Sequence, residues 1–391
     1  MSKPSKSIFF CSISYTVGLL ILTLAIYPET AMAFTRTNRV GLLPLRLATV
    51  KPVTRPPLKR WKTTGRKRNI AIDCSDKSQT ITVLESMSTM TGWTVREAID
   101  ESIERMIKEN VTEPDYSALY LMAASLELPW ERGIRDLDNY KSDNNKLHSA
   151  ILTPKQASSL ENMLKLRESH EPIQYVLGQW DFLDYTIAIR KPLLCPRPET
   201  EELVMRVASE TKKSPVRILD VGCGTGVIGI SLAEMLEEAL VEAIDVEPIA
   251  IETSTENAHR ILTDRCGYYK ATLASAFDYK ADCYFDVVVS NPPYIPRSDM
   301  DGLSEDVTRH ESDTALCGGM DGMDVIKTII QKLPEWCSSG AVCWMEVDPT
   351  HPKVIEEFLE DENEISGSTV RFDSSHKDMF GKERFVKLRV E

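Results

Sequence analysis

The feature that most limits the possible folds of this chain is an alternation of apolar runs and helical segments that begins at Val216. The first run, Arg217–Val221, leads through the turn Gly222–Gly226 into the apolar segment Val227–Leu236, and the run Leu240–Ile244 follows. Strands that alternate with helices form parallel sheets, because each crossover helix packs back on the sheet. The sequence therefore predicts an α/β domain with a mainly parallel sheet and helices on both faces.

Three glycines lie in the turn after the first strand, which reads Gly222-Cys223-Gly224-Thr225-Gly226. Glycine lets backbone approach a ligand closely, and a strand-to-helix turn presents N–H groups to that ligand. A lone Gly-x-Gly-x-Gly pattern is also typical of a simple tight turn. The spacing differs from the Gly-x-Gly-x-x-Gly pattern of dinucleotide-binding proteins, which favours S-adenosylmethionine over NAD.

Asp245 ends the second strand, about 20 residues beyond the glycines. An acidic side chain at this point can accept hydrogen bonds from both ribose hydroxyls of a nucleoside cofactor. Its alternative role is to cap the helix that begins near Pro248, and the two roles are compatible. We therefore predict a cofactor site formed by Gly222–Gly226 and Asp245.

Asn291-Pro292-Pro293-Tyr294 follows another buried strand, Phe285–Ser290. This order suits the methylation of a planar amide or amino nitrogen, which is a poor nucleophile because its lone pair is delocalised. The Asn291 side-chain oxygen and the Pro292 carbonyl can accept two N–H groups and so direct the nitrogen lone pair towards a methyl donor. The prolines stiffen the loop, and Tyr294 can stack on the flat group. The alternative interpretation is an ordinary Asn-Pro turn at a strand end.

Five segments carry a more specific signal, namely Glu171–Gly178, Pro196–Glu201, Gly222–Gly226, Ser290–Ile295 and Ala315–Gly322. In their order and spacing the chain resembles the HemK/PrmC family of protein-(glutamine-N5) methyltransferases, which modify peptide chain release factors. The match runs from roughly Pro114 to the C-terminus. Asn-Pro-Pro-Tyr also occurs in other methyltransferases, whereas Pro-Arg-Pro-Glu-Thr-Glu at residues 196–201 is far more restrictive.

The resemblance implies a Rossmann-like class I S-adenosylmethionine-dependent methyltransferase sheet, preceded by a small N-terminal helical domain. It implies that Gly222–Gly226 and Asp245 bind S-adenosylmethionine. The catalytic residues would be Asn291–Tyr294, which hold the glutamine of a Gly-Gly-Gln tripeptide in a release factor. The segment Arg197–Glu201 would line the pocket near the donor, with Arg197 and Glu199 binding the substrate.

Two positions depart from the family pattern. The family often has an acidic residue followed by an aromatic one where adenine docks, whereas this chain reads Ala274-Ser275-Ala276-Phe277-Asp278. We expect Phe277 to stack on the adenine. Asp348 in Met345–Asp348 stands where a glycine is common, which we interpret as a variation at a strand end.

The N-terminal segment has the composition of a targeting signal. In residues 1–33 two lysines precede the apolar run Ile8–Ile26, and Ala31-Met32-Ala33 is a small-x-small cleavage site, which together predict a signal peptide rather than a membrane anchor. Residues 34–68 contain 11 Lys and Arg and no Asp or Glu, as transit peptides do. The layout resembles the bipartite presequences of plastid proteins in algae with secondary plastids.

We therefore predict import into the plastid stroma and no membrane segment in the mature form. Mitochondrial import is the rival interpretation, and a basic tail on a secreted protein is the third.

Charge outside this leader argues against a nucleic-acid partner. The chain has 46 Lys and Arg and 59 Asp and Glu, of which residues 1–68 hold 13 and 1, so the remainder carries 33 − 58, or −25. Such acidity repels a phosphate backbone. It disfavours the alternative function, adenine-N6 methylation of DNA or RNA. A non-catalytic adaptor is a third possibility, which the intact glycines, Asp245 and Asn291 argue against. The nine cysteines form no Cys-x-x-Cys pair, so we expect no metal.

The remaining sequence divides into regions of different pattern. Residues 69–91 match no pattern and are interpreted as a linker, whereas residues 92–170 form helices with an apolar stripe at Ala98, Ile99, Ile103, Met106 and Ile107. By resemblance this helical domain docks the release factor.

Residues 171–215 are predicted to form a connecting hairpin near Phe182–Ile189 and a pocket segment. Residues 216–391 form the methyltransferase domain, which ends in a partly antiparallel pair of strands at Thr369–Phe372 and Phe385–Val390.

Overall fold

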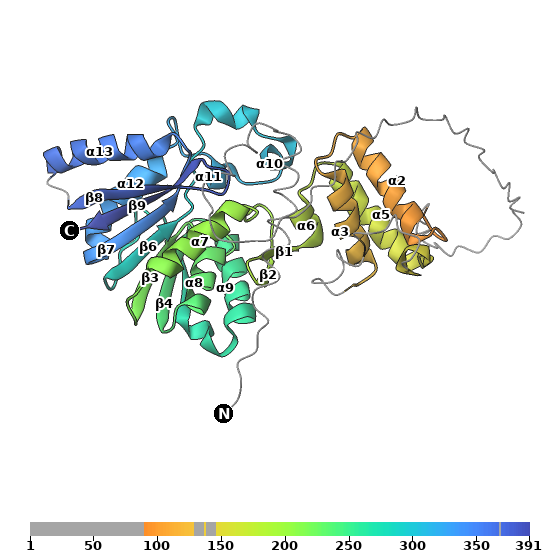
Figure 1. Cartoon of the computed structure of the whole chain (residues 1–391), viewed down its shortest axis with the longest axis horizontal. Helices are drawn as coiled ribbons and strands as arrows, with labels where there is room; N and C mark the ends of the chain where they lie inside the picture. Colours follow the sequence, from red (N-terminus) through yellow and green to blue (C-terminus); the bar gives the residue numbers. More distant parts are fainter. Residues whose placement is uncertain (1–89, 129–136, 138–145, 367–368) are drawn as a thin grey trace, which may run out of the picture. The chain divides into compact units, whose positions relative to one another are not determined.

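The computed structural model describes residues 90–128, 137, 146–366 and 369–391 (Figure 1). Contacts divide the chain into the units 1–80 and 81–391, and every described residue belongs to the second unit. The predicted signal peptide, the transit segment and all but the last two residues of the predicted linker lie outside the described residues. Within the described part of the chain, no helix has the length and apolar character needed to cross a membrane.

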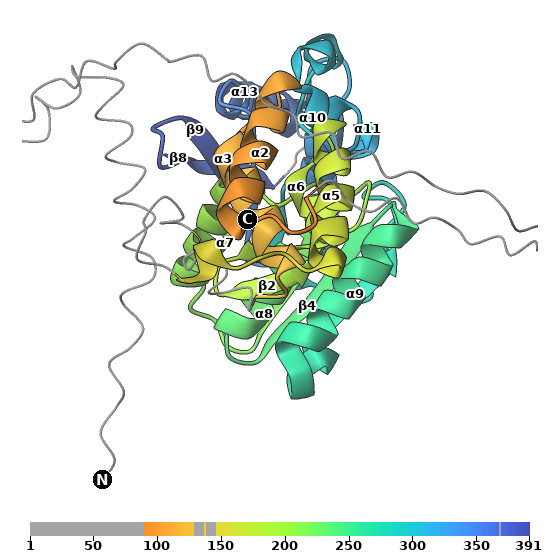
Figure 2. The same ribbon diagram turned by 90° about the vertical axis from the view of Figure 1, so that its right-hand side faces the viewer.

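The first described region is helical. Its helices are α2 (Val95–Lys108), α3 (Pro114–Ser125), the 3-10 helix η3 (Lys146–Ser149), α5 (Pro154–Glu168) and α6 (Ile173–Leu177). Both α2 and α5 start at a capping box, because Thr94 and Thr153 exchange hydrogen bonds with the third residue of the following helix. Helices α2, α3 and α5 lie beside one another (Figure 2), and α6 packs against the same apolar cluster.

The predicted apolar stripe of α2 is confirmed at Ala98, Ile99, Ile103 and Met106, which are buried. The prediction was wrong for Ile107, which is 56% exposed. Successive helical residues point about 100° apart. In the last turn of α2 only Met106 therefore faces the cluster.

A hairpin and a long helix follow the helical region. Strands β1 (Gln179–Phe182) and β2 (Tyr185–Ala188) pair antiparallel, so the predicted hairpin is present and begins three residues earlier than expected. Helix α7 (Pro198–Glu210) comes next, with proline in its first turn.

A seven-stranded sheet forms the centre of the remaining chain. Its strands are β3 (Val216–Val221), β4 (Ala239–Asp245), β5 (Tyr269–Leu273), β6 (Phe285–Ser290), β7 (Cys337–Glu346), β8 (Val370–Lys377) and β9 (Glu383–Val390). They lie in the order β5-β4-β3-β6-β7-β9-β8, parallel from β5 to β7, with β9 antiparallel to both β7 and β8. The predicted α/β class and the predicted antiparallel end of the sheet are confirmed.

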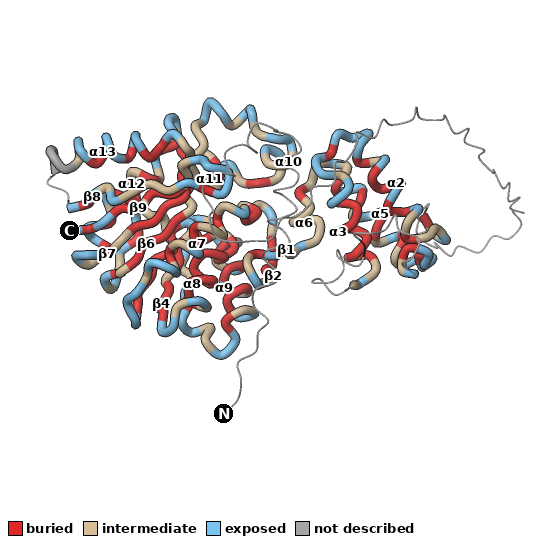
Figure 3. The backbone as a smooth tube through the Cα atoms, in the orientation of Figure 1, coloured by how far each residue is buried: buried red, intermediate tan, exposed pale blue. Residues whose placement is uncertain are grey.

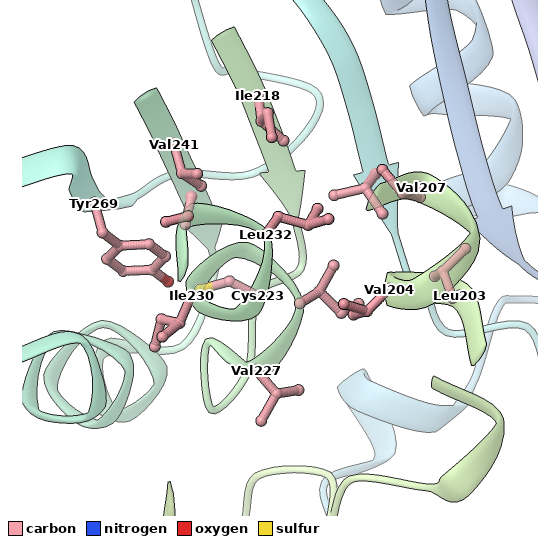
Figure 4. Packing of buried hydrophobic residues seen from close by; sticks show 14 of the residues in the cluster. Leu203, Val204, Val207, Ile218, Cys223, Val227, Ile230, Leu232, Val241 and Tyr269 are labelled. Atoms are coloured by element: carbon pink, nitrogen blue, oxygen red, sulfur yellow. The ribbon is translucent and has the colours of Figure 1, made fainter. Parts of the chain in front are cut away.

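Helices cover both faces of this sheet, and its inner strands are buried along most of their length (Figure 3). The helices of the first face are α7, α8 (Val227–Met235) and α9 (Pro248–Leu262), and those of the second face are α12 (Asp324–Trp336) and α13 (His351–Ser366). Figure 4 shows Leu203, Val204 and Val207 of α7 in one cluster with Ile230 and Leu232 of α8. Helix α7 therefore packs on α8, and it also contacts the sheet directly at β7.

The strand order determines where a ligand can bind. From β3 the chain builds outward through β4 to β5, and it then returns to add β6 and β7 on the other side of β3. Ligands of open α/β sheets bind outside the carboxyl ends of the strands at such a reversal. The segments that follow β3, β4, β6 and β7 meet at this edge. Between β6 and β7 the chain also forms η5 (Arg297–Gly302), α10 (Glu305–Thr308) and α11 (Asp313–Leu316), while η4 (Thr263–Tyr268) precedes β5.

Candidate active site

The glycine turn after β3 leaves open space directly over its backbone. Gly222 and Gly224 have φ angles of +73° and +54°, and a Cβ atom added at either would meet nothing within 4 Å. Gly226 differs, because its Cβ would lie 2.7 Å from the Cβ of Ser254 on α9. The first two glycines therefore allow a ligand to approach the backbone, while the third allows close packing of the helix.

Most N–H groups of this turn already have partners within the protein. Gly222 and Cys223 donate to the carbonyl of Ile244, and Gly224 donates to Asp245 Oδ2 at 2.8 Å. Asn257 Nδ2 donates to the Thr225 carbonyl at 2.9 Å. The Gly226 N–H donates to the Cys223 carbonyl at 2.7 Å, so the expectation that these N–H groups await a ligand is not met at four positions. The turn contributes shape and accessible backbone.

Asp245 links the glycine turn to the start of α9. Besides accepting from Gly224, it accepts from the N–H of Glu247 through Oδ1 at 2.9 Å. Burial raises the pKa of this carboxyl, and the two N–H donors act in the opposite direction. Each carboxylate oxygen retains a second lone pair, so the helix-start role and ribose binding remain compatible.

The Asn291–Tyr294 loop begins at the end of β6, beside β3. The Ser290 hydroxyl donates to the carbonyl of Val221 at 2.7 Å and so ties the two strand ends together. Asn291 Nδ2 donates to Thr200 Oγ1 at 3.1 Å. Among the described residues no donor reaches Asn291 Oδ1 or the Pro292 carbonyl oxygen. These are the two acceptors predicted from the sequence to hold the substrate amide, and that role stays a prediction.

A second glycine loop fixes the backbone of this motif. A Cβ at Gly318 would lie 2.6 Å from the Pro293 carbonyl oxygen, and a Cβ at Gly322 would lie 2.3 Å from that of Tyr294. Residues 295 and 317 form a parallel bridge that joins the two loops. The segment Ala315–Gly322 thus supports the Asn-Pro-Pro-Tyr loop from behind.

Two polar residues complete the hydrogen bonding of the site: Thr200, which lies in the segment Arg197–Glu201 predicted to line the pocket, and Glu346, which sequence reasoning did not assign to it. Thr200 Oγ1 donates to Glu346 Oε2 at 2.8 Å, and the Tyr294 hydroxyl donates to Glu346 Oε1 at 3.3 Å. Glu346 is only 1% exposed, and burial raises its pKa to about 7. The sequence signal that could have identified Glu346 is its position as an acidic residue at the carboxyl end of β7, the strand next to β6.

The residues predicted with less specific roles, Arg197, Glu199 and Phe277, lie in different surroundings. Arg197 Nη2 donates to both carboxylate oxygens of Glu311, at 2.9 and 3.1 Å, and thereby joins the start of α7 to the segment after α10. Glu199 is half-buried in the first turn of α7, and its charge raises the pKa of Glu346. Phe277, after β5, is 73% exposed. Its stacking on adenine stays a prediction.

Comparison with known proteins places this site in a family. The methyltransferase small domain matches residues 200–308. The human MTRF1L release factor glutamine methyltransferase is 34% identical over 250 residues, which are 61% of this chain and 73% of that protein. This chain belongs to the release factor glutamine methyltransferase family.

The release factor glutamine methyltransferase of Clostridium botulinum is 35% identical over 229 residues, which are 58% of this chain and 78% of that protein. Among solved structures, the ribosomal protein L11 methylase of Lactobacillus delbrueckii subsp. bulgaricus has a TM-score of 0.37 at 16% identity, over 51% of this chain and 82% of that chain.

The chain is accordingly a protein-(glutamine-N5) methyltransferase whose cofactor is S-adenosylmethionine. The open space over Gly222 and Gly224, together with the acid Asp245 at the next strand end, fits a nucleoside-containing cofactor. The matched region contains these residues and the Asn291–Tyr294 loop.

Proposed function

We propose that this enzyme methylates the side-chain amide nitrogen of the glutamine in the Gly-Gly-Gln motif of an organellar release factor. The observation that carries the proposal is the pair of unused acceptors, Asn291 Oδ1 and the Pro292 carbonyl, at the carboxyl edge of the sheet beside the glycine turn.

The chain would act mainly by positioning. An amide nitrogen carries two N–H groups, and the two acceptors can bind both of them in a fixed orientation. S-adenosylmethionine supplies a methyl group activated by a positively charged sulfur. Restricting the orientation of the amide favours in-line transfer by several powers of ten. Glu346 is buried and already accepts two hydrogen bonds, so we assign no base to the site and expect the amide proton to leave to water.

Charge favours a protein substrate over nucleic acid. An exocyclic adenine amine would fit the same two acceptors, which is why adenine-N6 methylation is the alternative. The −25 net charge outside the leader opposes binding to a phosphate backbone. Because the matched relatives are named for release factors, the glutamine substrate is the better supported choice.

We further propose that the helical region, α2 to α5, docks the release factor. This region is joined to the segment after the Asn-Pro-Pro-Tyr loop through Arg167, which is 3% exposed and donates to Asp306 Oδ2 at 3.0 Å. Arg167 also donates to the carbonyls of Thr112 and Glu171. A docked factor would therefore be held at a set position relative to the catalytic loop.

The proposed location is an organelle, with the plastid stroma first and the mitochondrion as the alternative. The basis is the signal-like segment 1–33 followed by the basic segment 34–68. A fluorescent protein fused to residues 1–70 should fill an organelle interior. Fluorescence that fills the endoplasmic reticulum instead would contradict the import proposal.

Methyl transfer from labelled S-adenosylmethionine by the full chain tests the function. The substrates are a plastid-type release factor, the same factor with Gln→Ala in Gly-Gly-Gln, and single- and double-stranded nucleic acid. Label on the intact factor alone supports the proposal. Label on nucleic acid would favour the adenine alternative, and donor binding without any transfer would favour a non-catalytic adaptor.

A further inference from the structure

We infer that Thr200 and Glu346 are positioning residues that fix which end of the Asn291 amide faces the substrate. The inference rests on the proposed function, in which the Asn291 oxygen accepts an N–H group of the substrate amide. The two ends of an asparagine amide have almost the same shape but opposite hydrogen-bonding character. A reversed amide would point its own N–H groups at the N–H groups of the substrate and repel them.

The order of donors determines the orientation. In its ionised form the Glu346 carboxylate only accepts hydrogen bonds, and a threonine hydroxyl has one proton to donate. The Thr200 proton is given to Glu346 Oε2 at 2.8 Å, so the Thr200 oxygen can only accept from Asn291. The group of Asn291 that lies 3.1 Å from it is therefore the NH2 group, and Oδ1 points away from Thr200.

Reversal of the amide would leave a buried group unpaired. With Oδ1 next to Thr200, the single hydroxyl proton would serve either Asn291 or Glu346, and the other acceptor would lose its partner. Glu346 is 1% exposed, and water cannot replace the missing donor there. The Tyr294 hydroxyl engages the other oxygen of Glu346, at 3.3 Å, so the same carboxylate holds both ends of the Asn-Pro-Pro-Tyr motif.

The side chains of Asn291, Thr200 and Glu346 come from three separate elements, which fix their relative positions. Thr200 lies in the first turn of α7, whose residues Leu203 and Val204 are fully buried in the core (Figure 4). Glu346 is the last residue of β7, which pairs with β6 immediately before Asn291. A rigid helix and a central strand thus meet the catalytic loop at one point, which is what positioning of an amide requires.

The simpler interpretation is that the bond between Thr200 and Glu346 only ties α7 to β7. Kinetics of the full chain on a Gly-Gly-Gln release factor distinguish the two. Thr200→Val keeps the shape of the side chain and removes the hydroxyl, and we expect kcat to fall about 10- to 100-fold. The KM for the factor and the Kd for S-adenosylmethionine should stay within about twofold. Thr200→Ser should restore kcat to within about threefold of the wild type.

The matched control is Thr253→Val. Thr253 on α9 is also fully buried, and its hydroxyl has no hydrogen-bond partner among the described residues. The control should retain the wild-type kcat. Thr200→Val with the wild-type kcat, or Thr200→Ser as slow as Thr200→Val, would overturn the inference.

Substitutions of Glu346 decide the case if Thr200→Val does not fold. Glu346→Gln can still accept from Thr200 and can donate to Tyr294, so kcat should stay within about threefold. Glu346→Met offers no acceptor and should be about 10- to 100-fold slower. If Glu346→Gln and Glu346→Met lose the same amount of kcat, the charge of Glu346 matters rather than the order of donors, and the inference is wrong. A wild-type protein that binds S-adenosylmethionine but does not label the factor would instead refute the proposed function.

Discussion

Gly322 offers a direct test of how the second glycine loop supports the catalytic motif. Its φ is +78°, and a Cβ would lie 2.3 Å from the Tyr294 carbonyl oxygen and 2.9 Å from His351 Cε1. Real Cβ contacts stay above 3.0 Å, so in Gly322→Ala the backbone of Tyr294 must move by about 0.7 Å. Pro292 and Pro293 stiffen this loop, so we expect the shift to reach the two acceptors.

Displacements of about 1 Å at a catalytic site can slow a reaction about 100-fold. We therefore expect kcat of Gly322→Ala to fall by about one to two powers of ten. The Kd for S-adenosylmethionine should hardly change, because the residues assigned to the donor follow β3 and β4. The left-handed backbone adds about 1–2 kcal/mol of instability for any residue with a Cβ. The assays are single-turnover methyl transfer, donor binding and denaturant unfolding.

Gly340→Ala is the matched control. Gly340 has a φ of +88°, and a Cβ there would meet nothing within 4 Å. It lies in β7 at some distance along the strand from Glu346. The control should show the same loss of stability with an unchanged kcat. A wild-type kcat in folded Gly322→Ala, or an equal loss of kcat in Gly340→Ala, would refute the reasoning.

Three further predictions concern binding, pH and domain contact. Asn291→Ala should bind S-adenosylmethionine normally in calorimetry but lose transfer, and wild-type turnover would disprove its role. Burial raises the pKa of Asp220 from 3.8 to about 7, so the folded state binds its proton more tightly than the unfolded state does. As the pH rises from 4 to 7, the free energy of unfolding should therefore fall by on the order of 4 kcal/mol. Asp220→Asn should lack this part of the decline when unfolding is measured by urea titration at each pH. Arg167→Met removes the buried partner of Asp306, which should cost about 3–5 kcal/mol of stability and raise the KM for the release factor. An unchanged KM would show that this contact plays no part in docking the factor.

Local features of the fold were predictable because a few neighbouring residues determine them. The capping boxes at Thr94 and Thr153 depend on side chains three residues apart. The Gly222–Gly226 turn and the Asn291–Tyr294 motif each follow an apolar strand, so their place at strand ends could be inferred from the order of the segments. Ile107 shows the limit of such patterns, since its exposure depends on what packs against the last turn of α2.

Contacts across long stretches of sequence could not be inferred in this way. The side chains of Thr200 and Glu346 are 146 residues apart in the sequence and hydrogen-bond only because α7 and β7 meet beside β6. The clash that forbids a side chain at Gly322 exists only where two loops touch. The donors of the glycine turn were assigned to a ligand from the sequence, whereas the structure pairs them with Ile244 and Asp245.

By itself, the sequence determined the α/β class, the two loops that follow strands and the family of the enzyme, because strand periodicity, turn residues and short motifs act within a few residues. Only the tertiary structure decided how those loops are held. The reversal of strand order at β3 brings the carboxyl ends of β4, β3, β6 and β7 to one edge, and side chains distant in the sequence can exchange hydrogen bonds only after that sheet has formed.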